Sequence, residues 1–270
     1  MRPRLKIAAA TTPSRGEMVL YKHDRDYAIQ VDGQDLMHSR QHASELALAR
    51  LGCAHLAGRN AARVLIGGLG MGYTLRQTLD MLGPEARVMV GELMAAVAEW
   101  NRAYFGELNG RPLEDPRVEL KTGDVLDLIR APGRFDAILL DVDNGPSAMT
   151  DPGNSRLYGL EGIRACRRAL RAKGCLAVWS AAPSKSFEQR LMTCRMHVRR
   201  FRVPAYQGAK SPSRFVWVAS EDRQCLPPSG DAGDAHRGSP YKKASGSDFF
   251  HKSISISTGV GSNAAGKPTR

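Results

Sequence analysis

The stretch Val64–Gly72 constrains the fold most strongly, because it joins a short apolar strand to a loop with four glycines in six residues. A helical pattern follows from about Tyr73 to Met81. Glycines in such a loop adopt backbone conformations closed to other residues, and they let another group approach the backbone closely. A strand, a glycine-rich loop and a helix in this order are typical of the first unit of an α/β domain.

The alternation of strand and helix patterns continues along most of the chain. We predict strands at 64–66, 87–92, 118–121, 135–140 and 175–179, helices at 73–81, 94–104, 125–129 and 159–170, and a closing antiparallel pair at 198–203 and 215–218. Apolar strands that alternate with helices form a parallel sheet covered on both faces, with right-handed crossovers. The sequence therefore predicts a Rossmann-like, doubly wound α/β domain over residues 56–220.

The two ends of the chain have a different texture. Short alternating stretches between Met18 and Ser39 predict a β-hairpin or small sheet, and residues 41–56 predict a helix. We therefore expect a small β-rich N-terminal cap with a junction helix over residues 1–55. Gly, Ser, Pro, Asp and Lys dominate residues 221–270, which predicts a disordered tail.

The chain is basic, with 39 Lys and Arg against 27 Asp and Glu and a net charge of +12. Much of this charge lies in two arginine clusters, at 164–173 and 190–202. The first cluster has helical spacing beside apolar residues, which is typical of the solvated face of an amphipathic helix. No zinc spacing, interleaved aromatic residues or nucleic-acid-binding module accompanies the charge, so we predict no nucleic-acid partner.

Two further features bear on location and chemistry. No run approaches the roughly 18 apolar residues that a membrane-spanning helix needs, so we expect no membrane partner. The five cysteines are scattered and contain no C-x-x-C pair, which indicates reduced thiols and neither a zinc site nor a disulfide framework. These features predict a cytoplasmic protein.

Acidic residues stand where the predicted strands end. Glu92 ends the second strand, 20 positions after Gly72, and Asp124 and Asp141 follow the next two strands. In open α/β sheets the ligand crevice lies at the carboxyl ends of the strands, where a carboxylate after the second strand typically binds ribose hydroxyls. A tight turn with a surface glutamate is the structural alternative. The series favours a nucleoside site of the S-adenosylmethionine type over a dinucleotide site.

The region from Val64 to about Val218, together with Gln41–Glu45 upstream, resembles the spermidine/spermine synthase (polyamine aminopropyltransferase) family, in its divergent spermidine synthase-like bacterial branch. The resemblance implies a domain that binds decarboxylated S-adenosylmethionine, often in a homodimer, and that acts in polyamine biosynthesis. It implies that Gly67, Gly68 and Gly70 line this co-substrate. It also implies that Glu92 holds the ribose, that Asp124 faces the adenine amine, and that Asp141 is catalytic.

The role implied for Asp141 is chemically reasonable. An amine attacks only when it is neutral, whereas a free alkylamine is mostly protonated at neutral pH. An adjacent carboxylate can hold the ammonium and then receive its proton as the amine attacks the carbon next to the sulfonium. Because the sulfonium is already a good leaving group, we predict no metal.

Two residues after the fourth strand are candidates for contact with the amine substrate. Asp143 follows Asp141 closely, and Tyr158 lies after a Pro-, Gly- and Ser-containing stretch that resembles a lid. Each has a structural alternative, since Asp143 can shape or cap a turn and Tyr158 can pack in the core.

The sequence departs from the family pattern at three places. Gly70 stands where the family usually has an acid, Asp141–Pro146 carries its second acid at a shifted position, and Ala43 or Ser44 replaces an expected tyrosine. Without the loop acid, a co-substrate that retains its carboxylate is no longer repelled. From the resemblance we expect aminopropyl transfer to an amine. The missing loop acid keeps a methyltransferase that uses S-adenosylmethionine as an alternative, and the altered Asp141–Pro146 segment keeps a non-catalytic nucleoside-binding relative as another.

Overall fold

The computed structural model describes residues 4–130, 132–142, 145–147 and 156–229. The chain divides into two units, Met1–Asp234 and Ala235–Arg270, and every described residue belongs to the first. Most of the predicted tail, from residue 230 onward, therefore lies outside the described residues.

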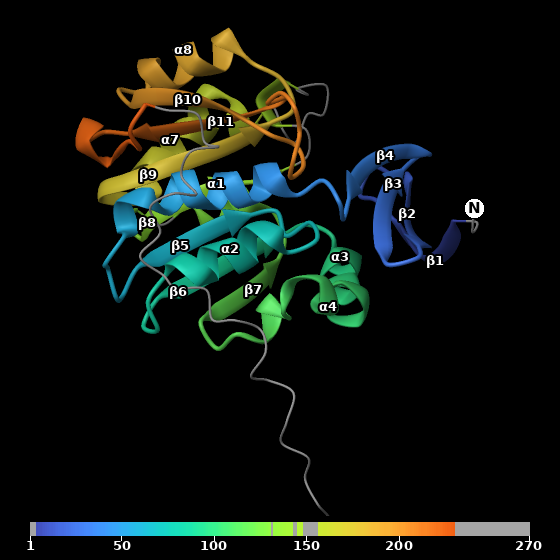
Figure 1. The fold of residues 1–270 in the computed structure, drawn as a ribbon. Helices are drawn as coiled ribbons and strands as arrows, with labels where there is room; N and C mark the ends of the chain where they lie inside the picture. Colours follow the sequence, from blue (N-terminus) through green and yellow to red (C-terminus); the bar gives the residue numbers. More distant parts are fainter. Residues whose placement is uncertain (1–3, 131, 143–144, 148–155, 230–270) are drawn as a thin grey trace, which may run out of the picture. The chain divides into compact units, whose positions relative to one another are not determined.

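The N-terminal cap is an antiparallel sheet with strands in sequence order. Its strands are β1 (Leu5–Thr11), β2 (Glu17–His23), β3 (Asp26–Val31) and β4 (Gln34–His38) (Figure 1). The middle strands pair in register from Met18 opposite Val31 to His23 opposite Asp26, and they bury Leu20 and Ile29 completely. This pair confirms the predicted hairpin, and β1 and β4 extend it on either side.

A junction helix leads from the cap to a sheet of seven strands. The junction is α1 (Ala43–Cys53) followed by the 3₁₀ turn η1 (Ala54–Leu56). The strands lie in the order β10-β11-β9-β8-β5-β6-β7, with β5 to β9 parallel and β10 and β11 antiparallel. They are β5 (Arg63–Gly67), β6 (Arg87–Glu92), β7 (Val118–Thr122), β8 (Phe135–Leu140), β9 (Leu170–Ser180), β10 (His197–Val203) and β11 (Arg214–Ser220).

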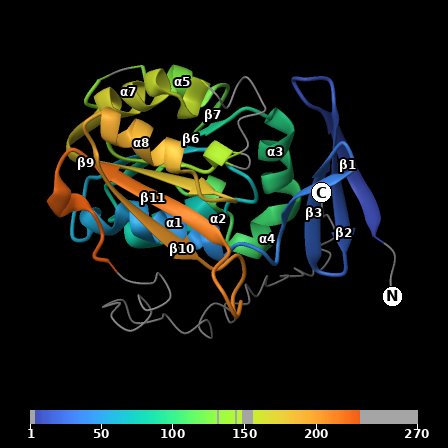
Figure 2. The ribbon, with the colours of Figure 1, turned by 90° about the horizontal axis from the view of Figure 1, so that it is seen from above.

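Helices cover both faces of this sheet, as the predicted doubly wound fold requires. One apolar core joins α1, α2 (Tyr73–Met81) and α3 (Ala95–Trp100) to the sheet, and a second joins α5 (Val125–Leu128), α7 (Leu160–Ala169) and α8 (Lys185–Thr193) to it. Figure 2 shows α1 and α2 on the opposite side of the sheet from α5, α7 and α8. The remaining short elements are η2 (Asn101–Phe105), α4 (Gly106–Asn109), η3 (Pro112–Glu114), η4 (Gly145–Ser147) and η5 (Arg223–Cys225).

The structure differs from the sequence-based elements at three places. The predicted helix 94–104 is α3 followed by the π-helical segment η2, whose first residue, Asn101, bonds the glycine loop through its side chain. The helix α8 was not predicted, because it buries only Phe187 and Leu191 among polar residues. Strand β9 begins five residues before the predicted 175–179.

Residues 221–229, which the sequence placed at the start of the disordered tail, contact the folded domain. The thiol of Cys175 donates a hydrogen bond to the carbonyl of Cys225 (3.3 Å), Leu226 packs against the core, and Pro227 is buried. The folded region therefore extends past the predicted boundary at residue 220. The sequence did not predict these contacts, because only a few side chains of residues 221–229 are apolar and residues 221–270 as a whole are rich in Gly and Ser.

Two observations concern groups that the sequence analysis weighed. Among the helices of the described ranges, none has the length and apolar character needed to cross a membrane. All five cysteines are free, and burial raises the pKa of Cys53, Cys166 and Cys175 to about 12. Thiols in such surroundings stay protonated, so they are poor nucleophiles.

Candidate active site

A cavity of about 270 Å³ lies at the carboxyl ends of the parallel strands, and we call it the carboxyl-edge cavity. Strand β4, the first turn of α1, the glycine loop and the ends of β8 and β9 contribute its walls, and β11 contributes its first residue. The described lining residues are Asp35, Leu36, Met37, His38, Gln41, Ser44, Glu45, Leu69, Gly70, Met71, Tyr73, Asp141, Trp179, Ala181, Ala205 and Arg214. The predicted crevice at this edge of the sheet therefore exists, and it contains Gly70 and Asp141.

The glycine loop packs directly on the backbone of the candidate catalytic residue. Gly68 has a φ of +89°, and a Cβ atom there would lie 2.2 Å from the carbonyl oxygen of Asp141. Only glycine satisfies both the left-handed conformation and this close approach. At Gly70 (φ +52°) a Cβ atom would meet Met37 at ordinary contact distance, with the sulfur 3.7 Å away.

Two asparagines fasten the other half of the loop. The side-chain amide of Asn101 donates to the carbonyl of Gly70 (2.7 Å), and that of Asn109 donates to the carbonyl of Met71 (2.5 Å). A Cβ at Gly72 would lie within 3 Å of both side chains. The segment from α3 to α4 thus fixes the loop that leads into α2.

Glu92 lies at the end of β6, where the sequence placed it, and is only 8% exposed. Its carboxylate accepts hydrogen bonds from the backbone N–H groups of Leu69 (2.9 Å) and Met94 (2.8 Å). The carboxylate therefore holds the glycine loop against β6. It does not line the carboxyl-edge cavity, and its contact with a ribose stays a prediction.

Asp124 begins α5 as its N-cap, and its carboxylate accepts a hydrogen bond from the backbone N–H of Leu126 (2.9 Å). Such a cap satisfies one of the free donors at a helix start. Asp124 does not line the carboxyl-edge cavity either, so its adenine contact also stays a prediction. Gly67 packs closely against α5, because a Cβ atom at Gly67 would lie 2.9 Å from the Val125 side chain.

Asp141 is the first residue after β8, and the loop and α2 position it from two sides. Its N–H donates to the carbonyl of Gly67 (2.8 Å), and its carboxylate accepts a hydrogen bond from the hydroxyl of Thr74 (2.6 Å). Burial raises the pKa of Asp141 to about 6, although the bond from Thr74 acts in the opposite direction. The carboxylate is thus ionised at neutral pH but much more basic than an ordinary aspartate.

A second carboxylate, which the sequence analysis did not assign to the site, lines the same cavity. Glu45 lies in the first turn of α1, and its side chain accepts a hydrogen bond from the hydroxyl of Ser44 (2.6 Å). Burial and the charge of Asp141 raise the pKa of Glu45 to about 8. Near neutral pH the two acids therefore carry one negative charge between them, with the proton on Glu45.

The two predicted substrate contacts have different outcomes. Tyr158 is fully buried, packs edge-on against Phe187, and donates its hydroxyl hydrogen bond to the carbonyl of Val142 (3.1 Å). Tyr158 thus supports the backbone next to Asp141 from within the core and does not line the carboxyl-edge cavity, and its contact with a substrate stays a prediction. Asp143 lies outside the described residues.

The junction between β4 and α1 closes the cavity on the side of the cap. The ring of His42 stacks on Tyr73 with centroids 4.1 Å apart, and the Tyr73 hydroxyl donates to the carbonyl of Ser39 (3.1 Å). His38 ends β4, and its Nδ1 accepts a hydrogen bond from the N–H of Arg40 (3.2 Å). Within the described ranges no three His, Cys, Asp or Glu side chains are grouped to hold a metal ion.

The wall opposite the glycine loop carries a positive charge. Arg214 is the first residue of β11. The start of β11 lies at the carboxyl edge, because β11 runs antiparallel to β9 with Phe215 opposite Ser180. The guanidinium donates to the carbonyl and hydroxyl of Ser213, and its charge lowers the pKa of Glu45. The neighbouring lining residues Ala181 and Ala205 are small.

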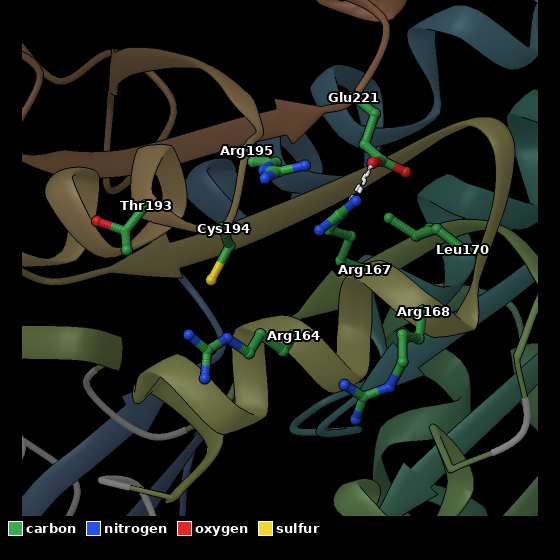
Figure 3. A pocket seen from close by; sticks show the side chains of 8 residues that line it. All are labelled: Arg164, Arg167, Arg168, Leu170, Thr193, Cys194, Arg195 and Glu221. Carbon is green, nitrogen blue, oxygen red and sulfur yellow. Dashed lines mark hydrogen bonds and ion pairs between the residues drawn. The ribbon is translucent and has the colours of Figure 1, made fainter.

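A larger hollow of about 620 Å³ lies at the opposite edge of the sheet, and we call it the arginine-lined cavity (Figure 3). Its lining residues are Arg164, Arg167, Arg168, Leu170, Thr193, Cys194, Arg195 and Glu221. Arg167 is paired with Glu221 (2.6 Å), and Arg164 is paired with Glu161 one helical turn away. Three of these arginines, Arg164, Arg167 and Arg168, lie on the exposed side of α7, which agrees with the predicted solvated helix face.

Comparisons with known proteins bear on the family resemblance. No family model matches the chain. A polyamine aminopropyltransferase of Mycobacterium tuberculosis is 32% identical over 127 residues, which are 46% of this chain and 23% of that protein. A polyamine aminopropyltransferase of Synechococcus sp. is 34% identical over 140 residues, which are 49% of this chain and 41% of that protein. The chain thus spans less than half the length of these relatives.

Solved structures agree with the sequence matches. A spermidine synthase in complex with the transition-state analogue AdoDATO superposes with a TM-score of 0.66 at 19% identity, covering 83% of this chain and 77% of that one. The spermidine synthase of Thermotoga maritima gives a TM-score of 0.65 at 20% identity, covering 83% and 76%. The chain resembles polyamine aminopropyltransferases in sequence and in fold. The predicted resemblance and the predicted Rossmann-like fold with a β-rich cap are therefore confirmed.

Proposed function

We propose that this protein transfers an aminopropyl group from decarboxylated S-adenosylmethionine to an amine. The observation that carries the proposal is the position of Asp141: it follows β8, sits against the backbone of Gly68 and lines a cavity at the carboxyl edge of the sheet. Polyamine aminopropyltransferases match the chain in sequence, and spermidine synthases match its fold.

The transfer needs one proton acceptor and correct alignment. The amine nitrogen attacks the propyl carbon next to the sulfonium, the C–S electron pair returns to sulfur, and methylthioadenosine leaves. Asp141, ionised at neutral pH with a raised pKa, accepts the proton that the amine loses. The raised pKa brings its basicity closer to that needed for this step, and the cavity walls position the reactants.

The adenosine part of the co-substrate is assigned to the other side of the glycine loop. Glu92 is already held at the loop by its bond from Leu69 and is proposed to bind the ribose as well. Asp124, at the start of α5, is proposed to face the adenine amine, and Gly67 and Gly68 to line the co-substrate. A homodimer and a cytoplasmic location complete the proposal.

Methyl transfer from intact S-adenosylmethionine is the second candidate. Gly70 favours it, because the loop has no carboxylate at the position where an acid would repel the carboxylate of that compound. The two candidates share the fold and the adenosine contacts, so only the co-substrate distinguishes them.

The experiment incubates the purified protein with decarboxylated S-adenosylmethionine and a mixture of diamines and amino acids, and measures methylthioadenosine release. We expect release by the wild-type protein and a loss of about 10²–10⁴-fold in Asp141→Asn, as for removal of a general base. A parallel reaction with S-adenosylmethionine measures S-adenosylhomocysteine. Release of S-adenosylhomocysteine alone would move the assignment to methyl transfer, and binding of either compound without any product would leave a non-catalytic relative.

A further inference from the structure

The wall of the carboxyl-edge cavity that faces away from the glycine loop has a charge that aminopropyl transfer to a simple amine does not require. Arg214 lines this wall at the start of β11. Within the described part of the chain, its guanidinium bonds only the Ser213 carbonyl and hydroxyl, and no carboxylate lies at ion-pair distance. A half-buried guanidinium without an acidic partner is a strong potential binder of a carboxylate.

The strand order places Arg214 on the acceptor side of the cavity. The glycine loop follows β5, Asp141 follows β8, Trp179 and Ala181 lie at the end of β9, and Arg214 begins β11. Because these strands are neighbours in the order β5-β8-β9-β11, Asp141 lies between the loop and Arg214. A donor bound at the loop therefore has its reacting carbon near Asp141, and the far part of the acceptor lies toward Arg214.

The remaining groups on this side fit the same ligand. Ala181 and Ala205 leave space beside the guanidinium, and the buried indole N–H of Trp179 has no hydrogen-bond acceptor among the described residues. The acids that line the cavity, Asp35, Glu45 and Asp141, lie on the walls formed by β4, α1 and the end of β8. A molecule with an amine at one end and an anion at the other matches this arrangement.

We propose that the acceptor is an amino acid, an amine that also carries a carboxylate, and that Arg214 binds this carboxylate while Asp141 faces the reacting amine. The inference rests on the proposed function. The new N–C bond forms as the donor's C–S bond breaks, its electron pair goes to sulfur, and the amine proton goes to Asp141. A plain diamine is disfavoured, because its second ammonium group would face the guanidinium.

The test compares three acceptors that differ at one position. Ornithine is 1,4-diaminobutane with one added carboxylate, and ornithinamide has the same shape without that negative charge. Calorimetry measures their binding to the full-length protein in the presence of methylthioadenosine. We expect ornithine to bind at least tenfold more tightly than either of the others.

Two variants assign this preference to one residue. Arg214→Gln keeps the polar side chain and removes the charge, and we expect it to abolish the preference for ornithine. Arg202→Gln is the matched control, because Arg202 lies opposite Phe215 on β10, is exposed, and does not line the cavity. It is expected to keep the preference.

Four results would overturn the inference: equal or tighter binding of 1,4-diaminobutane, a preference that survives Arg214→Gln, no binding of any of the three, or a guanidinium that serves the donor. The last would appear as weaker binding of S-adenosylmethionine, but not of its decarboxylated form, to Arg214→Gln.

A turnover assay with decarboxylated S-adenosylmethionine separates the two proposals. Methylthioadenosine release with 1,4-diaminobutane alone sustains aminopropyl transfer and removes the amino acid acceptor. The expected binding pattern without any release sustains the carboxylate site and removes aminopropyl transfer.

Discussion

The two ends of strand β8 each hold a partly or fully buried aspartate, and their surroundings differ. At the amino edge, the carboxylate of Asp136 accepts hydrogen bonds from Arg171 (3.0 Å), Arg59 (3.3 Å) and the N–H of Arg63 (2.8 Å). At the carboxyl edge, Asp141 has the neutral hydroxyl of Thr74 and the acid Glu45 nearby. The charge of Asp136 is therefore compensated, whereas that of Asp141 is not.

This difference separates a structural carboxylate from a reactive one. A buried acid paired with arginines stabilises the fold, because the guanidinium groups compensate its charge. An acid that burial makes more basic, without a cationic partner, can accept a proton. The same contrast applies to the two cavities, because the larger one contains paired surface charges and the smaller one contains the perturbed acids.

The largest effect is expected from exchanging each of these aspartates for asparagine. Asp136→Asn leaves two guanidinium groups without a carboxylate, so we expect it to lower the free energy of unfolding by about 2–3 kcal/mol. Asp141→Asn removes a buried, uncompensated charge, so we expect unchanged or higher stability together with the loss of transfer. Urea unfolding and methylthioadenosine release, measured on the same preparations, give both values.

This pair of variants can also break the comparison. Equal losses of stability in both would mean that Asp141 is compensated in the fold as Asp136 is. A folded Asp136→Asn protein that has lost transfer would mean that the amino edge takes part in the chemistry.

An effect that depends on pH is expected at Glu45. Burial and the charge of Asp141 raise its pKa from the ordinary value of 4.5 to about 8. Between about pH 5 and pH 8 the native state therefore holds a proton that the unfolded state has lost, so stability falls as pH rises through this range. In Glu45→Gln this part of the fall is absent, and we expect the variant to gain up to about 4 kcal/mol over wild type at pH 9 relative to pH 5.

Chemical unfolding at pH 5, 7 and 9 measures this difference. Asp141 still contributes a slope of the same sign at lower pH in Glu45→Gln, because its pKa is raised as well. Parallel curves of unfolding free energy against pH for the two proteins would show that Glu45 is solvated. They would contradict the conclusion that Glu45 and Asp141 share one proton near neutral pH.

The sequence predicted those parts of the molecule that depend on local patterns. Strand β5, the glycine loop and α2 were predicted because an apolar run, four glycines and a helical period follow one another within a few residues. The positions of Gly70 and Asp141 in one cavity followed from the rule that strand ends meet at one edge. The overall resemblance then supplied the reaction.

The parts that the sequence did not predict depend on contacts between distant segments. Glu45 lies on the junction helix, and only the folded chain brings it to Asp141. Arg214 lies one residue before the predicted strand 215–218, and its place in the cavity follows from the antiparallel direction of β11. Tyr158 was open to two interpretations because an aromatic residue after a loop suits both a lid and a core position.

The smallest effect is expected at the arginine-lined cavity, from the pair that Figure 3 shows between Arg167 and Glu221. The two side chains are 34% and 56% exposed, so water and salt screen their attraction. We expect Arg167→Gln, Glu221→Gln and the double variant to change the free energy of unfolding by less than about 1 kcal/mol each, with a coupling of about 0.5 kcal/mol that declines in high salt. Transfer should be unchanged in all three. A coupling that is several times larger, or a loss of transfer, would show that the amino edge is organised as tightly as the site on the opposite edge, and the division between structural and reactive charge would then fail.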